Sequence, residues 1–201
     1  MRRKLLLATN NQAKVDEYQS LLRNLPFDLV TLAERSITTI VDEVGESLEE
    51  NARLKATVLV AQSQLLVLAD DSGLEVDALG GEPGRLSARY AGEGASDRDR
   101  TSYLLSRLKG VPWSNRSARF RCIIAIATPD GEIELCSGEC GGFITFEPMG
   151  EHGFGYDPVF YLTELDKTMA ELPLDIKNQV SHRGQAARKA YQVLARLSFT
   201  K

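Results

Sequence analysis

The chain has 201 residues, 43% hydrophobic and 26% charged, which is the composition of a folded globular protein and excludes a disordered or fibrous chain. This length supports one sizeable core but is short for two, so we expect a single domain over 1–201. The net charge of −4 and the pI near 5.3 argue against a broad basic face, so we expect no nucleic-acid partner.

Cysteine usage and hydropathy indicate the compartment. The cysteines at 122, 136 and 140 are odd in number and lie in apolar, strand-like sequence, which predicts buried free thiols in a reducing environment. The first apolar run, 5–8, is too short for a signal peptide or a membrane span. We therefore expect a cytoplasmic protein with no membrane partner.

The chain begins with a predicted strand, polar turn and helix. The apolar run 4–9 breaks at Asn10 and Asn11, where asparagine is a good helix N-cap, and apolar residues at helical spacing follow until Pro26. Such a turn directs backbone N–H groups and a helix dipole at a site above the sheet, where phosphate is a common ligand. Lys14 adds a charge there, although a first-turn lysine is more often solvated.

A second helix is predicted after a weaker strand and turn over 27–39. Ser47 and Glu50 have capping-box spacing, and the helix runs to about residue 63. Its residues Asn51 and Lys55 share one face and are candidates to line a phosphate site, although a solvated lysine is commoner. The acids before the helix usually complement its dipole, and we keep Glu43 as a candidate metal ligand.

The stretch 68–92 is the centre of the predicted chemistry. The apolar run 65–69 predicts a strand ending at Asp70 and Asp71, where open α/β sheets place their ligands and where Mg²⁺ would compensate two repelling carboxylates. Asp-Asp-Ser-Gly is also ordinary turn chemistry, and by itself it favours a turn. The tightly turned loop over 80–90 shifts the balance toward a functional site.

A third helix and a long hairpin follow. Ser96 and Asp99 predict a capped helix that ends at Gly110. Between 116 and 145 apolar residues alternate around a strong turn at 129–131, which predicts a β-hairpin.

The loop over 150–160 is rich in glycine and carries one aromatic ring. Glycines on either side of Phe154 permit close backbone approach, the ring offers a stacking face, and Asp157 offers an acceptor. These features suit a planar heterocycle, but an ordinary glycine-rich loop with a core phenylalanine is equally consistent.

Near the end of the chain, His182 and Arg183 begin the last helix with the wrong charge for its dipole, which favours an anion or a carbonyl-rich ligand nearby.

Several short stretches together resemble the inosine/xanthosine triphosphate pyrophosphatase family, also called HAM1-like or dITP/XTP pyrophosphatases. Each stretch is weak alone, but their order over most of the chain is specific. They are 8–11 with Lys14, 50–52 with Lys55, 68–92, 153–158, 169–172, and 177–178 with 181–184.

The resemblance implies an enzyme that hydrolyses ITP, dITP and XTP to the nucleoside monophosphate and pyrophosphate with Mg²⁺. It implies Asp71 and Lys55 as catalytic residues, and Asp71 and Glu43 as metal ligands. The implied substrate-binding residues are Thr9, Asn10, Asn11, Gln12, Ala13, Lys14, Asn51, Ser72, Phe154, Gly155, Tyr156, Asp157, Lys177, His182 and Arg183.

The resemblance also implies a mixed α/β fold with a long twisted sheet flanked by helices, two lobes around a nucleotide cleft, and a homodimer. Ala13, where relatives often have glycine, and 162–165, where proline and glycine are common, depart from the family pattern.

Two rival functions stay open. One is a Maf-like pyrophosphatase that acts on pyrimidine or modified nucleotides, against which the stretch 181–183 argues. The other is a nucleotide-binding module without catalysis, in which acids beside a phosphate site would be hard to explain because they repel phosphate.

Overall fold

The computed structural model describes residues 2–199, and the chain divides into two compact units. Unit 1 comprises Met1–Asp71, Cys122–Gly138 and Arg183–Lys201, and unit 2 comprises Ser72–Arg121 and Glu139–His182. Neither unit is one continuous stretch, so the chain is not two domains joined in sequence.

Unit 1 is built on parallel strands. The strand β1 (Arg3–Leu7) pairs in parallel with β2 (Phe27–Thr31) and with β3 (Leu66–Val76), and Leu5 lies opposite both Leu29 and Leu66. Three consecutive leucines in β1 are fully buried, as expected for a strand that is covered on both faces. The predicted first strand is confirmed.

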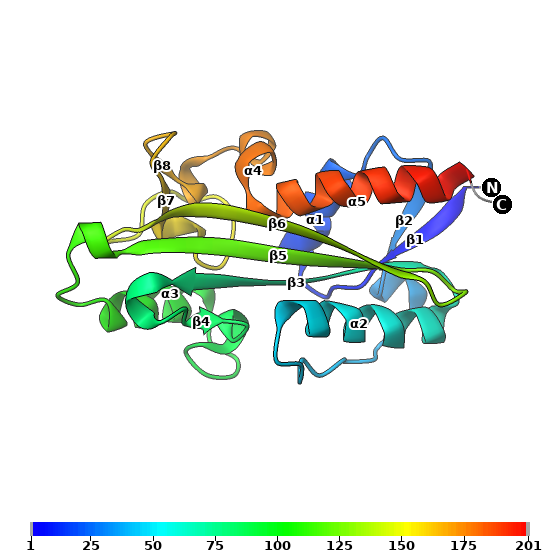
Figure 1. The fold of residues 1–201 in the computed structure, drawn as a ribbon, viewed down its shortest axis with the longest axis horizontal. Coiled ribbons are helices and arrows are strands. Elements are labelled where there is room, and N and C mark those ends of the chain that lie inside the picture. The colour runs from blue at the N-terminus through cyan, green and yellow to red at the C-terminus, as the bar shows by residue number, and fades with distance from the viewer. Residues whose placement is uncertain (1, 200–201) are drawn as a thin grey trace. The chain divides into compact units, whose positions relative to one another are not determined.

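Helices cover both faces of these strands (Figure 1). The helices α1 (Gln12–Leu21) and α5 (His182–Phe199) pack on the face that carries Leu7 and Leu68, whereas α2 (Leu48–Ser63) packs on the face that carries Leu6 and Val67. The alternation of side chains along each strand therefore divides unit 1 into two apolar layers.

The helix starts follow local sequence signals. The Asn11 side chain accepts a hydrogen bond from Lys14 N, 3.3 Å away, and so caps α1 as predicted. Ser47 caps α2 in the same way, but the Glu50 carboxylate accepts from Glu46 N at 2.7 Å. In the predicted capping box this carboxylate would accept from the backbone N–H of Ser47, the N-cap residue. The hydrogen bond that completes the box is therefore displaced by one residue.

Unit 2 contains the second half of β3 together with β4 (Pro83–Gly84), β7 (Phe160–Leu162), β8 (Lys167–Thr168), α3 (Asp97–Arg107) and α4 (Leu174–Val180). Its core gathers Leu74, Leu104, Phe120, Ile144 and Phe160. Short 3₁₀ turns lie at Ala33–Arg35, Asp77–Leu79, Ser87–Arg89, Trp113–Asn115, Asp157–Val159 and Met169–Glu171.

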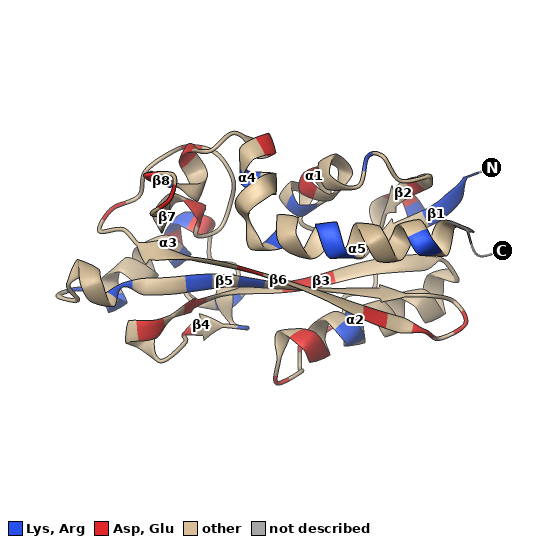
Figure 2. Cartoon of the chain, turned by 45° about the horizontal axis from the view of Figure 1, so that its top comes forward, with Lys and Arg blue, Asp and Glu red and all other residues tan. Residues whose placement is uncertain are grey.

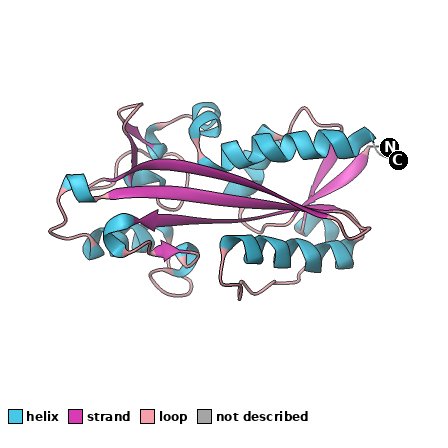
Figure 3. Cartoon of the chain, in the orientation of Figure 1, coloured by secondary structure: helices cyan, strands magenta, loops and turns pink. Residues whose placement is uncertain are grey.

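Figure 3 shows the strands in magenta, among them three long ones. Each of these three contributes residues to both units. They are β3, β5 (Ser117–Ala127) and β6 (Ile133–Ile144), and the sheet order is β2-β1-β3-β5-β6-β7-β8, with β4 pairing to β3. The strands β5 and β6 are neighbours in this order, and only residues 128–132 join them, so they form a hairpin as predicted. The sheet is mixed and flanked by helices, and the predicted fold class is confirmed.

One prediction of local structure is wrong. The strand that was expected to end at Asp70 and Asp71 continues through Ser72 and Gly73 to Val76. A Cβ atom on Gly73 would lie 2.3 Å from the carbonyl oxygen of Gly84 in β4, so glycine serves a close strand approach here and makes no turn. The two glycines in this contact are eleven residues apart, so the sequence around Gly73 does not indicate that the strand continues.

Three further observations concern the whole described chain. The three cysteines are buried free thiols, as predicted. Figure 2 shows acidic and basic residues interspersed along the helices and strands. Among the described residues, no helix is both long and apolar enough to cross a membrane.

Candidate active site

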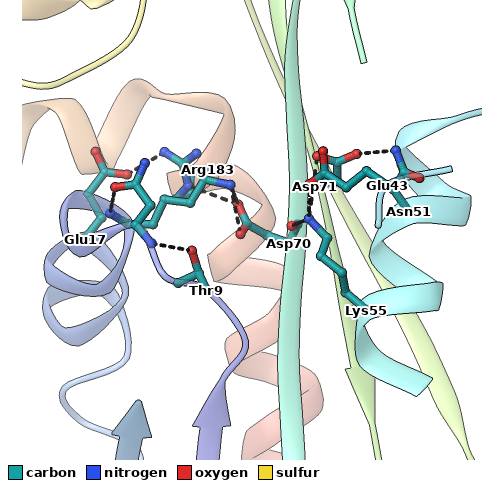
Figure 4. A network of polar contacts seen from close by, with 10 residues as sticks. Thr9, Glu17, Glu43, Asn51, Lys55, Asp70, Asp71 and Arg183 are labelled. Carbon is teal, nitrogen blue, oxygen red and sulfur yellow. Dashed lines mark hydrogen bonds and ion pairs between the residues drawn. The ribbon is translucent and has the colours of Figure 1, made fainter. Parts of the chain in front are cut away.

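Adjacent residues of β3 direct two buried carboxylates to opposite sides of the strand (Figure 4). Asp70 faces α1 and Arg183, whereas Asp71 faces α2. Leu7, the last residue of β1, lies beside Leu68, so both acids lie just past the carboxyl end of this parallel neighbour. That is the expected place for a ligand, although β3 itself continues.

Asp70 lies in a closed network of charges. The Lys14 ammonium is 3.1 and 3.0 Å from its two carboxylate oxygens, and Arg183 Nε is 3.5 Å from one of them. Arg183 Nη1 also pairs with the buried Glu17 carboxylate at 2.6 Å. Two cations thus face two anions, and Lys14 is not the solvated lysine that its position alone would suggest.

The network keeps Asp70 ionised. Burial alone would raise the pKa of Asp70, but Lys14, Arg183 and Lys55 outweigh burial and lower that pKa well below its usual range. Burial would lower the pKa of Arg183, and the charges of Glu17 and Asp70 raise it instead. The positive charge at the start of α5 is therefore compensated by side chains of this chain.

Asp71 has a different set of partners. Asn51 Nδ2 donates to one carboxylate oxygen at 3.0 Å, and Lys55 Nζ lies 3.7 Å from the other. The same ammonium is 2.9 Å from the Glu43 carboxylate and donates to the backbone carbonyl of Asp70 at 2.6 Å. Asn51 and Lys55 share one face of α2, as their spacing predicts.

The electrostatics at Asp71 oppose those at Asp70. Burial and then the nearby charge of Glu43 raise the pKa of Asp71, while Lys55 and the Asn51 hydrogen bond lower it by less. For Lys55 burial acts to lower the pKa, but Asp71, Asp70 and Glu43 together raise it. Lys55 is thus a fixed positive charge between two carboxylates.

A tight backbone contact holds the segment that carries Glu43. Asn51 Oδ1 accepts a hydrogen bond from Gly45 N at 2.8 Å, and a Cβ on Gly45 would lie 2.7 Å from that oxygen. Glycine is therefore needed for the segment to approach α2. One side chain, Asn51, links this segment to Asp71.

Glu43 and Asp71 supply the hard oxygen ligands that a divalent cation such as Mg²⁺ prefers. Within residues 2–199 no cluster of three or more His, Cys, Asp or Glu residues is arranged to hold a metal. A cation at this pair therefore needs further oxygen ligands, and substrate phosphates are a common source.

The segment from Thr9 to Lys14 forms the entry to α1. Thr9 Oγ1 accepts from Asn11 N at 3.2 Å, and Gln12 Nε2 donates to Asp16 at 2.8 Å. Asn10 and Asn11 are exposed and Ala13 is half-buried, so the first turn of α1 is accessible at the carboxyl end of β1. Helix starts of this kind bind phosphate readily.

The predicted residues of unit 2 form a second group. Asp157 accepts from Phe154 N at 2.9 Å and pairs with the buried Lys177 ammonium at 2.5 Å. That ammonium lies 4.8 Å from the centre of the Phe154 ring, and the Tyr156 hydroxyl donates to the Ser87 carbonyl. The loop is therefore fixed by polar contacts within itself and with neighbouring segments.

His182 and Ser72 complete the unit 2 residues. The buried His182 ring stacks on Phe120, with ring centres 4.6 Å apart and 12° between the planes. Ser72 is half-buried in β3, directly after Asp71.

Residues 5–193 match the Ham1 family over nearly the whole chain. The chain belongs to the Ham1 family. It is 50% identical over 194 residues to a dITP/XTP pyrophosphatase of Desulforamulus reducens, with 96% of each chain covered. It is 45% identical over 189 residues to a dITP/XTP pyrophosphatase of Bacillus subtilis, with 94% of this chain and 96% of the relative covered.

Solved structures of the Ham1 family share the fold. A HAM1 protein from Coxiella burnetii is 41% identical with a TM-score of 0.87, covering 96% of this chain and 99% of that one. The Ham1 protein of Staphylococcus aureus is 40% identical with a TM-score of 0.85, covering 96% and 98%. The family resemblance seen in the sequence is confirmed.

Two polar residues of this Ham1 chain were missed by the sequence analysis. Glu17 is 3% exposed and ion-paired with Arg183, and its signal was an acid next to the core residue Tyr18 in α1. Asp97 accepts a hydrogen bond from Gly155 N at 2.6 Å, and no local pattern joins these two positions.

Proposed function

We propose that this chain is a Mg²⁺-dependent pyrophosphatase that hydrolyses the non-standard purine nucleotides ITP, dITP and XTP to the monophosphate and pyrophosphate. The observation that carries the proposal is the cluster of Asp71, Lys55 and Glu43, in a chain that is 50% identical to a dITP/XTP pyrophosphatase. A buried carboxylate with a raised pKa beside a fixed cation suits phosphoanhydride hydrolysis.

Each residue of the cluster has a role in the proposed reaction. Glu43 and Asp71 would hold Mg²⁺, which when bound supplies positive charge to phosphate oxygens. Asp71 accepts the proton of the attacking water, and its raised pKa makes its carboxylate a stronger base than an exposed one. Lys55 neutralises charge that develops on the phosphates.

The remaining predicted residues bind the nucleotide in this proposal. The segment Thr9 to Lys14, with Asn51 and Ser72, contacts the triphosphate. The loop Phe154 to Asp157 and Lys177 hold the nucleoside, with the Phe154 ring as a stacking face. His182 and Arg183 donate hydrogen bonds to the 6-oxo group of hypoxanthine or xanthine, where adenine presents an amino donor.

The family match does not favour either rival function, and both make different predictions. A Maf-like enzyme would hydrolyse UTP or dTTP faster than ITP, and a non-catalytic module would bind ITP without hydrolysis. The homodimer, the cytoplasmic location and the single-domain organisation stay predictions.

The deciding experiment measures product release from ITP, dITP, XTP, GTP, ATP and UTP, with Mg²⁺ and with a chelator. We expect monophosphate and pyrophosphate from ITP, dITP and XTP, only with Mg²⁺, and on the order of 10⁴ less turnover of ATP. Orthophosphate as the product, faster turnover of UTP, or full activity in chelator would overturn the proposal.

A further inference from the structure

The first turn of α3 holds the loop that carries Phe154. Asp97, the first residue of α3, accepts a hydrogen bond from Gly155 N at 2.6 Å. Thr101, one turn later and buried, donates from Oγ1 to the Gly155 carbonyl oxygen at 3.3 Å. One short segment of helix thus binds both peptide groups of the glycine that follows Phe154.

A second carboxylate fixes the preceding peptide. Asp157 accepts from Phe154 N, and its ion pair with Lys177 places the ammonium over the Phe154 ring. Gly155 has a φ of +64°, a conformation in which the chain reverses after Phe154. The peptide groups on both sides of Phe154 are therefore held, one from within the loop and one from α3.

The orientation of Asp97 is itself set by a neighbour. Arg100 pairs with the other carboxylate oxygen of Asp97 and donates to the carbonyl oxygens of Ala88 and Ala95, at 3.0 and 2.5 Å. With that oxygen occupied, the Oδ2 atom is left facing Gly155 N. An acid at a helix start also complements the helix dipole, so this second role must be separated by experiment.

We propose that Asp97 is a positioning residue that holds the Phe154 ring where it stacks on the nucleobase. That a nucleobase binds here rests on the proposed function. That Asp97 restrains the loop rests on the hydrogen bonds within unit 2. Stacking does not depend on the pattern of donors and acceptors on the base. Asp97 therefore affects the binding of all purine substrates alike and leaves the chemistry at Asp71 unchanged.

The test compares Asp97→Ala with Asp97→Asn and Asp99→Ala. The asparagine variant keeps an oxygen that can accept from Gly155 N. Asp99 is the matched control, because it lies in the same turn and closes the capping box with Ser96, yet none of its hydrogen bonds reaches the loop. Loss of Asp99 removes an acid and a cap without removing the restraint.

Two readouts are measured on the full chain. In Asp97→Ala we expect amide hydrogen exchange at Gly155, followed by NMR without nucleotide, to accelerate about tenfold, and KM for ITP and XTP to rise by roughly fivefold to tenfold with kcat within about twofold. Asp97→Asn restores both readouts to near the wild-type values, and Asp99→Ala lowers thermal stability while leaving both unchanged.

Unchanged exchange in Asp97→Ala, faster exchange with unchanged KM, or an equal rise of KM in Asp99→Ala would each overturn the inference. A wild-type chain that hydrolyses none of the purine triphosphates overturns the proposed function instead. In that case the exchange experiment still decides whether Asp97 restrains the loop.

Discussion

Asp70 and Asp71 are neighbours in sequence and both are buried, yet they have opposite electrostatic environments (Figure 4). Asp70 faces two cations, Lys14 and Arg183, and its pKa is lowered. Asp71 shares one cation with a second carboxylate, Glu43, and its pKa is raised. The side of the strand on which each acid lies decides this difference.

The comparison separates a charge with a structural role from one that suits the proposed reaction. The charge of Asp70 is neutralised by its ion pairs, so it anchors Lys14 and Arg183 and has little tendency to accept a proton. Asp71 is a carboxylate whose charge is only partly compensated, which is the state that a base or a cation ligand requires. The sequence suggested that the two acids share one metal site, but each has its own set of partners on its own side of the strand. Asp70 is therefore not a second ligand beside Asp71.

The largest expected effect is on catalysis at Asp71. Asp71→Asn keeps the shape of the side chain but removes the base and the charge, so we expect kcat to fall at least about a thousandfold. The measurement is pyrophosphate release from ITP with Mg²⁺. Residual activity within about tenfold of wild type would assign the base to another group.

The second prediction concerns stability, for which we expect Asp70 to matter more than Asp71. Asp70→Asn leaves half-buried Lys14 and buried Arg183 undercompensated, so we expect the free energy of unfolding to fall by about 3–5 kcal/mol. Urea denaturation measures this quantity, and Asp71→Asn is the matched control because the folded environment of Asp71 raises its pKa and so does not stabilise its charged form. Equal losses in the two variants would contradict the separation of roles.

The smallest expected effect is on the pH dependence of stability, to which the two acids contribute with opposite signs. It is measured by urea denaturation at a series of pH values in the presence of a chelator. Because the folded-state pKa of Asp70 is lowered, its stabilising contribution is complete above about pH 5 and is lost as the pH falls below about 4. The folded-state pKa of Asp71 is raised, so its ionisation destabilises the fold as the pH rises from about 4 through that pKa.

The two asparagine variants should therefore diverge from wild type in opposite directions. The deficit of Asp70→Asn shrinks at low pH, whereas Asp71→Asn gains stability relative to wild type as the pH rises. Parallel stability curves for the two variants would show that the environments of the two acids do not differ as the structure indicates.

Signals carried by a few neighbouring residues were predicted well. The N-caps at Asn11, Ser47 and Ser96 and the full capping box with Asp99 are local hydrogen bonds, and each forms where the sequence pattern predicts it. The return bond of Glu50 differs because the path of the preceding segment decides which backbone N–H it can reach.

Signals that depend on distant segments were missed. The strand through Gly73 was predicted to stop because glycine after two acids is typical of turns, but β4 packs against that glycine. The restraint of Gly155 by Asp97 joins residues 58 positions apart, so no pattern in either segment indicates it.

The sequence by itself determined the helices and strands that carry local signals, their order along the chain and the membership of the Ham1 family, because caps, alternation and short motifs are local properties. Only the tertiary structure decided which cation each acid meets. Lys14 and Arg183 reach Asp70 from 56 and 113 residues away, because α1 and α5 pack on one face of β3 while α2 brings Lys55 to the other. Packing of helices on the two faces of one strand thus turns two adjacent aspartates into a structural anchor and a candidate base.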